Sequence, residues 1–289
     1  VYLKSPLEPT IPCTDRAENT VSWGSGGLGV RLELVICLGP KEERDTLCFH
    51  RRGHTLPALE RCSMQVDEPV LLPRLSRVAV CGGTHGNELS GVYLVREMLK
   101  TEKRKEVGEP ASVLMVLSNP RAMQQCSRYV DTDLNRCFTH ATLNGPISEG
   151  APYEIFRARE LNALLGPKGS RAAVDLICDL HNTTANMGLC FIAYSDCDWI
   201  CLHIFRYLQK QMPDTPARFI HFDLSTKESY SLDSIGKHGF AMEIGPQPHG
   251  CVKSNVYTAM KEGVQHMQDW VRCFNSGFQL NINKSESKI

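Results

Sequence analysis

The sequence lacks the features that would place it in a membrane or on nucleic acid. Its 289 residues contain no apolar run near the ~18 residues that a transmembrane helix needs, so no integral membrane association is expected. Neither sign of charge is in excess, because 32 Lys and Arg residues balance 32 Asp and Glu residues. This balance provides no strongly basic surface for a nucleic-acid partner, and none is expected.

The cysteines lack the spacing of a disulfide framework. All 13 are scattered, their number is odd, and no Cys-x-x-Cys pair occurs. Residues 1–6 do not contain the apolar core of a signal peptide, so a cytoplasmic protein with free, mostly buried thiols is expected. The hydrophobic content of 42% is enough for a sizeable buried core.

Strand and helix patterns alternate regularly from about residue 64 onward. Strands are predicted at residues 78–81, 113–117, 174–180, 190–194, 219–222 and 240–244. Helices are predicted at residues 88–99, 152–165, 199–211 and 255–274. This alternation predicts an α/β sandwich with a mixed, largely parallel sheet. In such folds, ligands bind at the carboxyl ends of the strands.

A histidine and a glutamate stand close together in the glycine-rich segment GGTHGNE, which follows the first of these strands. The turn presents His85 and Glu88 side by side, and His181 follows a second apolar strand. Two histidines and a carboxylate form the ligand set of a catalytic zinc with one open position, although manganese or cobalt could replace zinc. Alternatively, His85 and Glu88 form a surface pair, and His181 is a helix cap or a buried, hydrogen-bonded histidine.

The segment SRYVDTDLNR at residues 127–136 places two arginines around an acidic pair and an asparagine. Arginine recognises carboxylates and stabilises a developing oxyanion. Next to a metal, Arg128 and Arg136 therefore indicate a substrate that carries a carboxylate. The alternative is a loop that Arg–Asp ion pairs hold together.

A carboxylate interrupts the last predicted strand, where Glu243 lies among apolar residues just before Gly245 and Pro246. Burial of a carboxylate is costly unless the group is paired, solvated or functional. Beside a metal-bound water, Glu243 could act as the general base and then protonate the leaving amine. The alternative is a buried structural salt bridge.

These segments resemble the signatures of the aspartoacylase family of zinc amidohydrolases. GGTHGNE, SRYVDTDLNR, DLHNTTANMG and MEIGPQPHG match them in this order, and the resemblance extends over residues 78–274. It implies a zinc carboxypeptidase-like α/β/α fold, one Zn²⁺ per chain, a small-molecule N-acyl amino acid substrate and a homo-oligomer. By motif position, the zinc ligands would be His85, Glu88 and His181.

The resemblance also assigns catalytic and substrate-binding residues. Glu243 would be the general acid/base and Arg128 would polarise the scissile carbonyl, whereas Asn135 and Arg136 would bind the α-carboxylate of the substrate. At the position of Asp233, aspartoacylase itself carries an arginine that binds the β-carboxylate of N-acetylaspartate. An aspartate there would repel a second carboxylate. The chain therefore resembles the aminoacylases that act on N-acyl aromatic amino acids and mercapturic acids.

The two ends of the chain depart from the family. Residues 1–63, rich in Pro, Gly and Arg, are predicted to be a disordered extension. The catalytic domain is predicted at residues 64–275, and a polar tail at residues 276–289 is expected in place of the family's C-terminal β-rich domain. The resemblance also allows a peripheral location at the apical membrane. Three alternatives stay open: a catalytically incomplete variant that only binds zinc or joins an oligomer, an aspartoacylase, and a carboxypeptidase-like metallopeptidase.

Overall fold

The computed structural model describes residues 34–36, 47–49, 72–102, 112–195 and 198–277, which belong to two compact units. In the first unit, the described parts are two strands, β1 (Leu34–Ile36) and β2 (Leu47–Phe49), which pair antiparallel. The second unit, residues 72–278, contains the large sheet and every predicted site residue. The predicted extension and tail lie mostly outside the described residues, so the domain boundaries stay predictions.

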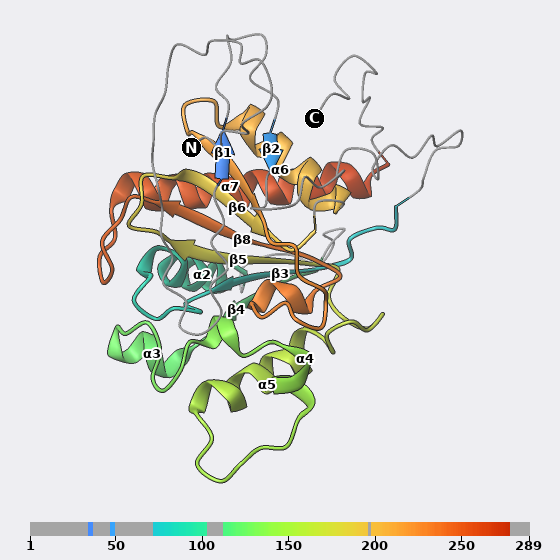
Figure 1. Cartoon of the computed structure of the whole chain (residues 1–289). Helices are drawn as coiled ribbons and strands as arrows, with labels where there is room; N and C mark the ends of the chain where they lie inside the picture. Colours follow the sequence, from blue (N-terminus) through green and yellow to red (C-terminus); the bar gives the residue numbers. More distant parts are fainter. Residues whose placement is uncertain (1–33, 37–46, 50–71, 103–111, 196–197, 278–289) are drawn as a thin grey trace, which may run out of the picture. The chain divides into compact units, whose positions relative to one another are not determined.

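Six strands form the large sheet, in the order β4-β3-β5-β8-β6-β7 (Figure 1). They are β3 (Arg77–Gly82), β4 (Ser112–Leu117), β5 (Leu176–Asn182), β6 (Gly188–Ala193), β7 (Ala217–His221) and β8 (His238–Gly245). All neighbours are parallel except β6 and β8, which are antiparallel. The mixed, largely parallel sheet confirms the predicted α/β fold, and each strand overlaps one predicted from the sequence.

Helices lie on both faces of this sheet. Figure 1 shows α6 (Trp199–Gln211) and α7 (Ser254–Asn275) on one side, and α4 (His140–Asn144) and α5 (Tyr153–Leu165) on the other. Helix α2 (Leu89–Glu102) packs against α7. The four long helices confirm the predicted ones. No helix in the described part of the chain is both long enough and apolar enough to cross a membrane.

Four short helical elements were not predicted, because a single helical turn leaves no periodicity in a sequence. They are α3 (Pro120–Gln125), α4 and two 3₁₀ helices, η1 (Leu134–Arg136) and η2 (Leu232–Ile235). Local side chains define the starts of α3 and η1. The side chain of Asn119 accepts from the N–H of Ala122 at the start of α3, and Asp133 accepts from the N–H of Asn135 in η1.

The α5 side of the sheet is packed unevenly. Its core cluster combines side chains of β3, β4 and β5 with others from α4, α5, η1 and η2. Among the described residues, this cluster takes none from β6, β7 or β8. On the same face, η2 packs against β8, whereas Ile192 of β6 and Ile220 of β7 are only half-buried.

Candidate metal centre

The three predicted metal ligands meet at the carboxyl ends of β3 and β5. His85 and Glu88 come from the turn after β3, and His181 is the penultimate residue of β5. One possible ligand atom from each residue lies within 4.8 Å of the others. All three side chains are buried, with 1–4% exposure. The structure therefore contains a group that could bind a metal, while the identity of the ion stays a prediction.

Each imidazole has one nitrogen directed at Glu88 and the other at a different carboxylate. Glu88 Oε1 lies 2.7 Å from His85 Nδ1, and Oε2 lies 2.9 Å from His181 Nδ1. On the opposite sides of the rings, His85 Nε2 lies 3.1 Å from Asp133 Oδ1, and His181 Nε2 lies 2.8 Å from Asp179 Oδ2. A proton on each Nε2 satisfies the outer contacts and leaves both Nδ1 lone pairs directed toward Glu88, as metal binding requires.

Glycines allow the backbone approach that builds this turn. Gly83 has a φ of 75°, in the left-handed region that favours glycine. A Cβ on Gly86 would lie 2.1 Å from the backbone carbonyl carbon of Ala122, so only glycine permits α3 to pack here. The glycines of the motif are therefore needed to present His85 and Glu88.

The electrostatics of the cluster favour positive charge. Burial opposes the charged form of both histidines, but the facing carboxylates outweigh burial and raise the pKa of His85 and His181. Burial acts to raise the pKa of Glu88, yet the two imidazoles lower it well below its usual range. With neutral imidazoles, the three negative charges of Glu88, Asp133 and Asp179 would face a single positive charge, that of Arg128. The donor set therefore fits a divalent cation, which supplies the missing positive charge.

Glu243 lies beside this cluster. It pairs in register with His181 across β5 and β8, and its Oε2 is buried without a hydrogen-bond partner. Burial raises its pKa to about 7, a rise that His181 opposes and Glu88 reinforces. A carboxyl group with such a pKa can both accept and release a proton at neutral pH.

Arg128 reaches the cluster from the loop before η1. Its Nε and Nη2 donate to Asp133 Oδ2 at 3.2 and 2.9 Å, and its Nη1 lies 3.6 Å from Glu88 Oε1. The side chain is 35% exposed, so the guanidinium faces both the cluster and the solvent. The exposed part of the guanidinium is therefore accessible to a molecule bound beside the cluster.

Asn135 and Arg136 lie in η1 but differ in exposure. Asn135 is buried, accepts from the N–H of Leu232 at 2.9 Å, and places Nδ2 3.4 Å from His181 Nε2. Arg136 is exposed, donates to the Asn135 carbonyl at 2.8 Å, and lies over the Tyr230 ring. Arg136 is thus the more accessible of the two predicted carboxylate-binding residues.

The structure buries Asp233 in η2, where it is 2% exposed and accepts from the Ser231 hydroxyl. Burial raises its pKa to about 6; Ser231 lowers it and the nearby Asp179 raises it. Its predicted influence on a substrate carboxylate would therefore act through space rather than by contact. That role stays a prediction.

The sequence analysis missed Glu154, which supports the arginine-bearing loop from the first turn of α5. Its fully buried carboxylate accepts from the N–H groups of Val130, Asp131 and Thr132 at 2.7, 3.1 and 3.1 Å. It also accepts from Asn119 Nδ2 at 3.2 Å. A glutamate in a first helical turn is so common that no signal in the sequence linked it to the site.

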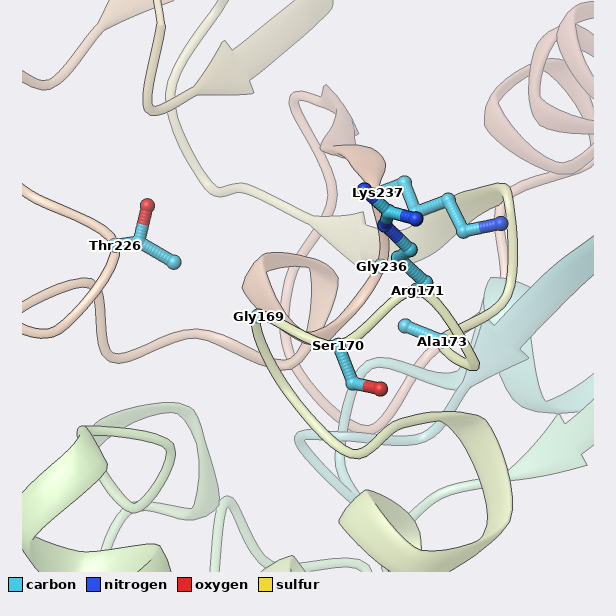
Figure 2. Close-up of a pocket in the computed structure, with 7 residues that line it drawn as sticks. All are labelled: Gly169, Ser170, Arg171, Ala173, Thr226, Gly236 and Lys237. Atoms are coloured by element: carbon cyan, nitrogen blue, oxygen red, sulfur yellow. The ribbon is translucent and has the colours of Figure 1, made fainter. Parts of the chain in front are cut away.

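A separate hollow of about 530 Å³ lies at the end of the sheet opposite the metal ligands (Figure 2). Its lining residues are Gly169, Ser170, Arg171, Ala173, Thr226, Gly236 and Lys237. Gly236 and Lys237 directly precede β8, so the hollow lies at amino ends of strands, whereas the metal ligands lie at carboxyl ends. None of the predicted site residues lines it.

A family model and several known proteins match the part of the chain that contains this cluster. Residues 74–271 match the family model for the succinylglutamate desuccinylase/aspartoacylase catalytic domain. The chain is 56% identical over 209 residues to "N-acyl-aromatic-L-amino acid amidohydrolase (carboxylate-forming) B" of Danio rerio, a match that covers 72% of this chain and 67% of that protein. The Homo sapiens protein "N-acyl-aromatic-L-amino acid amidohydrolase (carboxylate-forming)" is 47% identical over 209 residues, which is 72% of this chain and 65% of that protein.

Solved structures show the same relationship. Murine aminoacylase 3 matches with a TM-score of 0.67 and 43% identity, over 71% of this chain and 67% of that chain. The succinylglutamate desuccinylase from Chromobacterium violaceum shares the fold, with a TM-score of 0.51 and 21% identity over 72% of this chain and 63% of that chain. The chain thus spans about two thirds of the length of the proteins that it matches.

Proposed function

The chain belongs to the succinylglutamate desuccinylase/aspartoacylase family, and from this premise we propose that it is a zinc-dependent amidohydrolase of N-acyl amino acids. The substrates would be N-acyl aromatic amino acids, including mercapturic acids, and the products a carboxylate and a free amino acid. The names of relatives at 56% and 47% identity support the aromatic class. The cytoplasmic location stays a prediction from the sequence, and the apical location and the homo-oligomer stay predictions from the resemblance.

The observation that carries this proposal is the buried cluster of His85, Glu88 and His181 with Glu243 beside it. Two imidazole nitrogens and one carboxylate oxygen suit zinc, with room for one more ligand. A zinc ion bound there supplies Lewis acidity, which lowers the pKa of water and polarises a carbonyl oxygen.

The side chains around the cluster would handle protons and charge. Glu243 would take a proton from the attacking water and pass it to the departing amine, a cycle that suits a pKa of about 7. Arg128 would donate hydrogen bonds to the oxygen that becomes negative as the amide carbonyl is attacked. Asp133 and Asp179 would hold the two imidazoles in their orientations.

Substrate recognition would use the residues of η1 and η2. Arg136 and Asn135 would bind the α-carboxylate, with the exposed guanidinium as the main contact. Asp233, buried behind them, would disfavour a second substrate carboxylate by its charge. A substrate such as N-acetylaspartate would therefore be hydrolysed less well than an N-acetyl aromatic amino acid.

The test is to measure the zinc content of the purified chain together with hydrolysis of N-acetyl-L-phenylalanine and N-acetyl-L-aspartate. We expect Glu243→Gln to keep zinc and lose turnover, and His85→Ala to lose zinc. Glu160→Gln, an exposed glutamate paired with Arg157 on α5, is the matched control and should change neither. Turnover by Glu243→Gln, or stoichiometric zinc in His85→Ala, would contradict the assignment.

The same assay separates the alternatives. A preference for N-acetyl-L-aspartate would identify an aspartoacylase, and cleavage of N-blocked peptides alone would identify a carboxypeptidase-like enzyme. Zinc without turnover of any of these would identify a metal-binding variant that acts only as an oligomer partner.

A further inference from the structure

One row of side chains on the sheet face that carries Glu243 is apolar, next to a row that contains Cys190 and Arg218. The strand register places Glu243 opposite Cys190, Ala241 opposite Ile192, and Ile192 opposite Ile220. Alternate residues of a strand share one face of the sheet, so the side chains of Ala241, Ile192 and Ile220 form a row on the same face as Glu243. This row, the apolar floor, directly adjoins the carboxylate proposed as the acid/base.

The apolar floor is covered at one end and partly open at the other. Ala241 is buried in the strand against which η2 packs. Ile192 and Ile220 are both half-buried, whereas their strand neighbours Phe191 and Phe219, on the opposite face, are buried. The two isoleucines therefore expose apolar area next to the candidate site.

Aromatic side chains border the floor. Tyr194 directly follows the last residue of β6, and its ring centroid lies 5.8 Å from that of Tyr230 and 6.0 Å from that of Phe222. The Tyr194 hydroxyl accepts from the N–H groups of Tyr230 and Ser231 at 3.4 and 3.2 Å. These bonds attach the Tyr194 hydroxyl to the backbone that leads into η2.

The border also adjoins the proposed carboxylate-binding residue. The Arg136 guanidinium carbon lies 4.6 Å from the centroid of the Tyr230 ring. Ile192 lies on the strand next to Glu243 and pairs with Ala241, two residues away from it. Neighbouring strands are about 4.8 Å apart and alternate residues of a strand about 6.8 Å apart, so one amino acid side chain can bridge the distance from Glu243 to Ile192. A substrate bound to Arg136 with its amide at Glu243 would thus place its own side chain over the floor.

We propose that Ile192, Ile220 and Tyr194 form the subsite for the aromatic side chain of the substrate. This inference rests on the proposed function and names the residues that set its specificity. The floor supplies apolar area, and Tyr194 supplies a ring edge or face for aromatic packing. A small side chain such as that of alanine would leave most of this surface in contact with water.

The test uses the zinc-loaded full chain with Glu243→Gln, so that ligands bind without turnover. Calorimetric titration with N-acetyl-L-phenylalanine and N-acetyl-L-alanine gives two Kd values and their ratio. We expect the phenylalanine derivative to bind at least about tenfold more tightly. Adding Ile192→Thr should reduce this ratio about tenfold, and the milder Ile192→Val about threefold, because both remove apolar contact with the ring.

The matched control is Ile155→Thr, which changes a half-buried isoleucine of α5 outside the floor and should keep the ratio. An unchanged ratio in Ile192→Thr and Ile192→Val would overturn the subsite but leave the amidohydrolase function standing. If Ile192→Thr does not fold, the ratio measured with Ile192→Val decides. Failure of the Glu243→Gln chain to bind either ligand would contradict both the proposed function and the subsite.

Discussion

Asp133 joins a candidate metal ligand to the arginine beside it. Its Oδ1 lies 3.1 Å from His85 Nε2, and its Oδ2 accepts from Arg128 Nε and Nη2 at 3.2 and 2.9 Å. Burial opposes its ionised form, but His85 and Arg128 keep its pKa well below the usual range. One ionised carboxylate therefore orients an imidazole and a guanidinium at the same time.

Asp133→Asn should weaken metal binding about 10- to 100-fold, the usual effect of losing a carboxylate that orients a ligating histidine. The amide keeps the size of the side chain but removes the charge that His85 and Arg128 share. Competition with a chromophoric zinc chelator measures the affinity. Asp131→Asn is the control, because Asp131 accepts from the Tyr153 N–H at the start of α5 instead. Equal zinc affinities in the two variants would contradict the role of Asp133.

Glu154→Gln should destabilise the protein by about 2–4 kcal/mol. In the unmodified chain three backbone N–H groups donate to the Glu154 carboxylate, and in the variant some of them would face the NH₂ group of an amide, which cannot accept. Zinc affinity should fall as well, since the same loop carries Arg128 and Asp133. Urea unfolding measures the loss of stability. Glu160→Gln, on the exposed side of the same helix, should change it by under ~0.5 kcal/mol. Similar stability losses in the two variants would show that the loop does not depend on Glu154.

Asp233 should make stability depend on pH. Its native pKa of about 6 lies above the ~3.9 of an unfolded aspartate, so the native state binds the proton more tightly. The resulting stabilisation is complete below about pH 4 and is lost as the pH rises through about 6. Asp233→Asn cannot titrate, yet it keeps an acceptor oxygen for the Ser231 hydroxyl.

Between about pH 4 and pH 7, the unmodified chain should therefore lose on the order of 2 kcal/mol of stability relative to Asp233→Asn. Urea unfolding of both chains at several pH values in this range measures the difference. Two pH–stability curves that run parallel would mean that Asp233 does not titrate in this window.

Metal removal should lower the melting temperature. The carboxylates of Glu88, Asp133 and Asp179 surround the two imidazoles, and a bound cation would balance their negative charge. Ligand binding to the native state alone stabilises it by about 2.7 kcal/mol at a free concentration of 100 times Kd. Calorimetry with added zinc and with excess chelator measures the shift. In His85→Ala the shift should disappear, and a zinc-dependent shift that persists there would place the metal elsewhere.

Local sequence determined the six strands of the large sheet, the four long helices and the candidate ligands. The apolar runs of the six strands and the glycine turn before Glu88 act over a few neighbouring residues, so they can be read without knowing the fold. Ligands bind at the carboxyl ends of the strands in such folds, so His85 and His181 were expected to lie close together there. Family motifs added roles for Arg128 and Glu243, but not their contacts.

Only the tertiary structure decided which side chains support those residues. Glu154 meets the backbone of residues 130–132, and Asp233 is buried, because helices and loops distant in sequence pack over the sheet. Ile192 joins the row beside Glu243 only because β6 runs antiparallel to β8 and lies between β8 and β7. Strand order and direction depend on the packing of the whole domain, and a local sequence pattern does not contain that information.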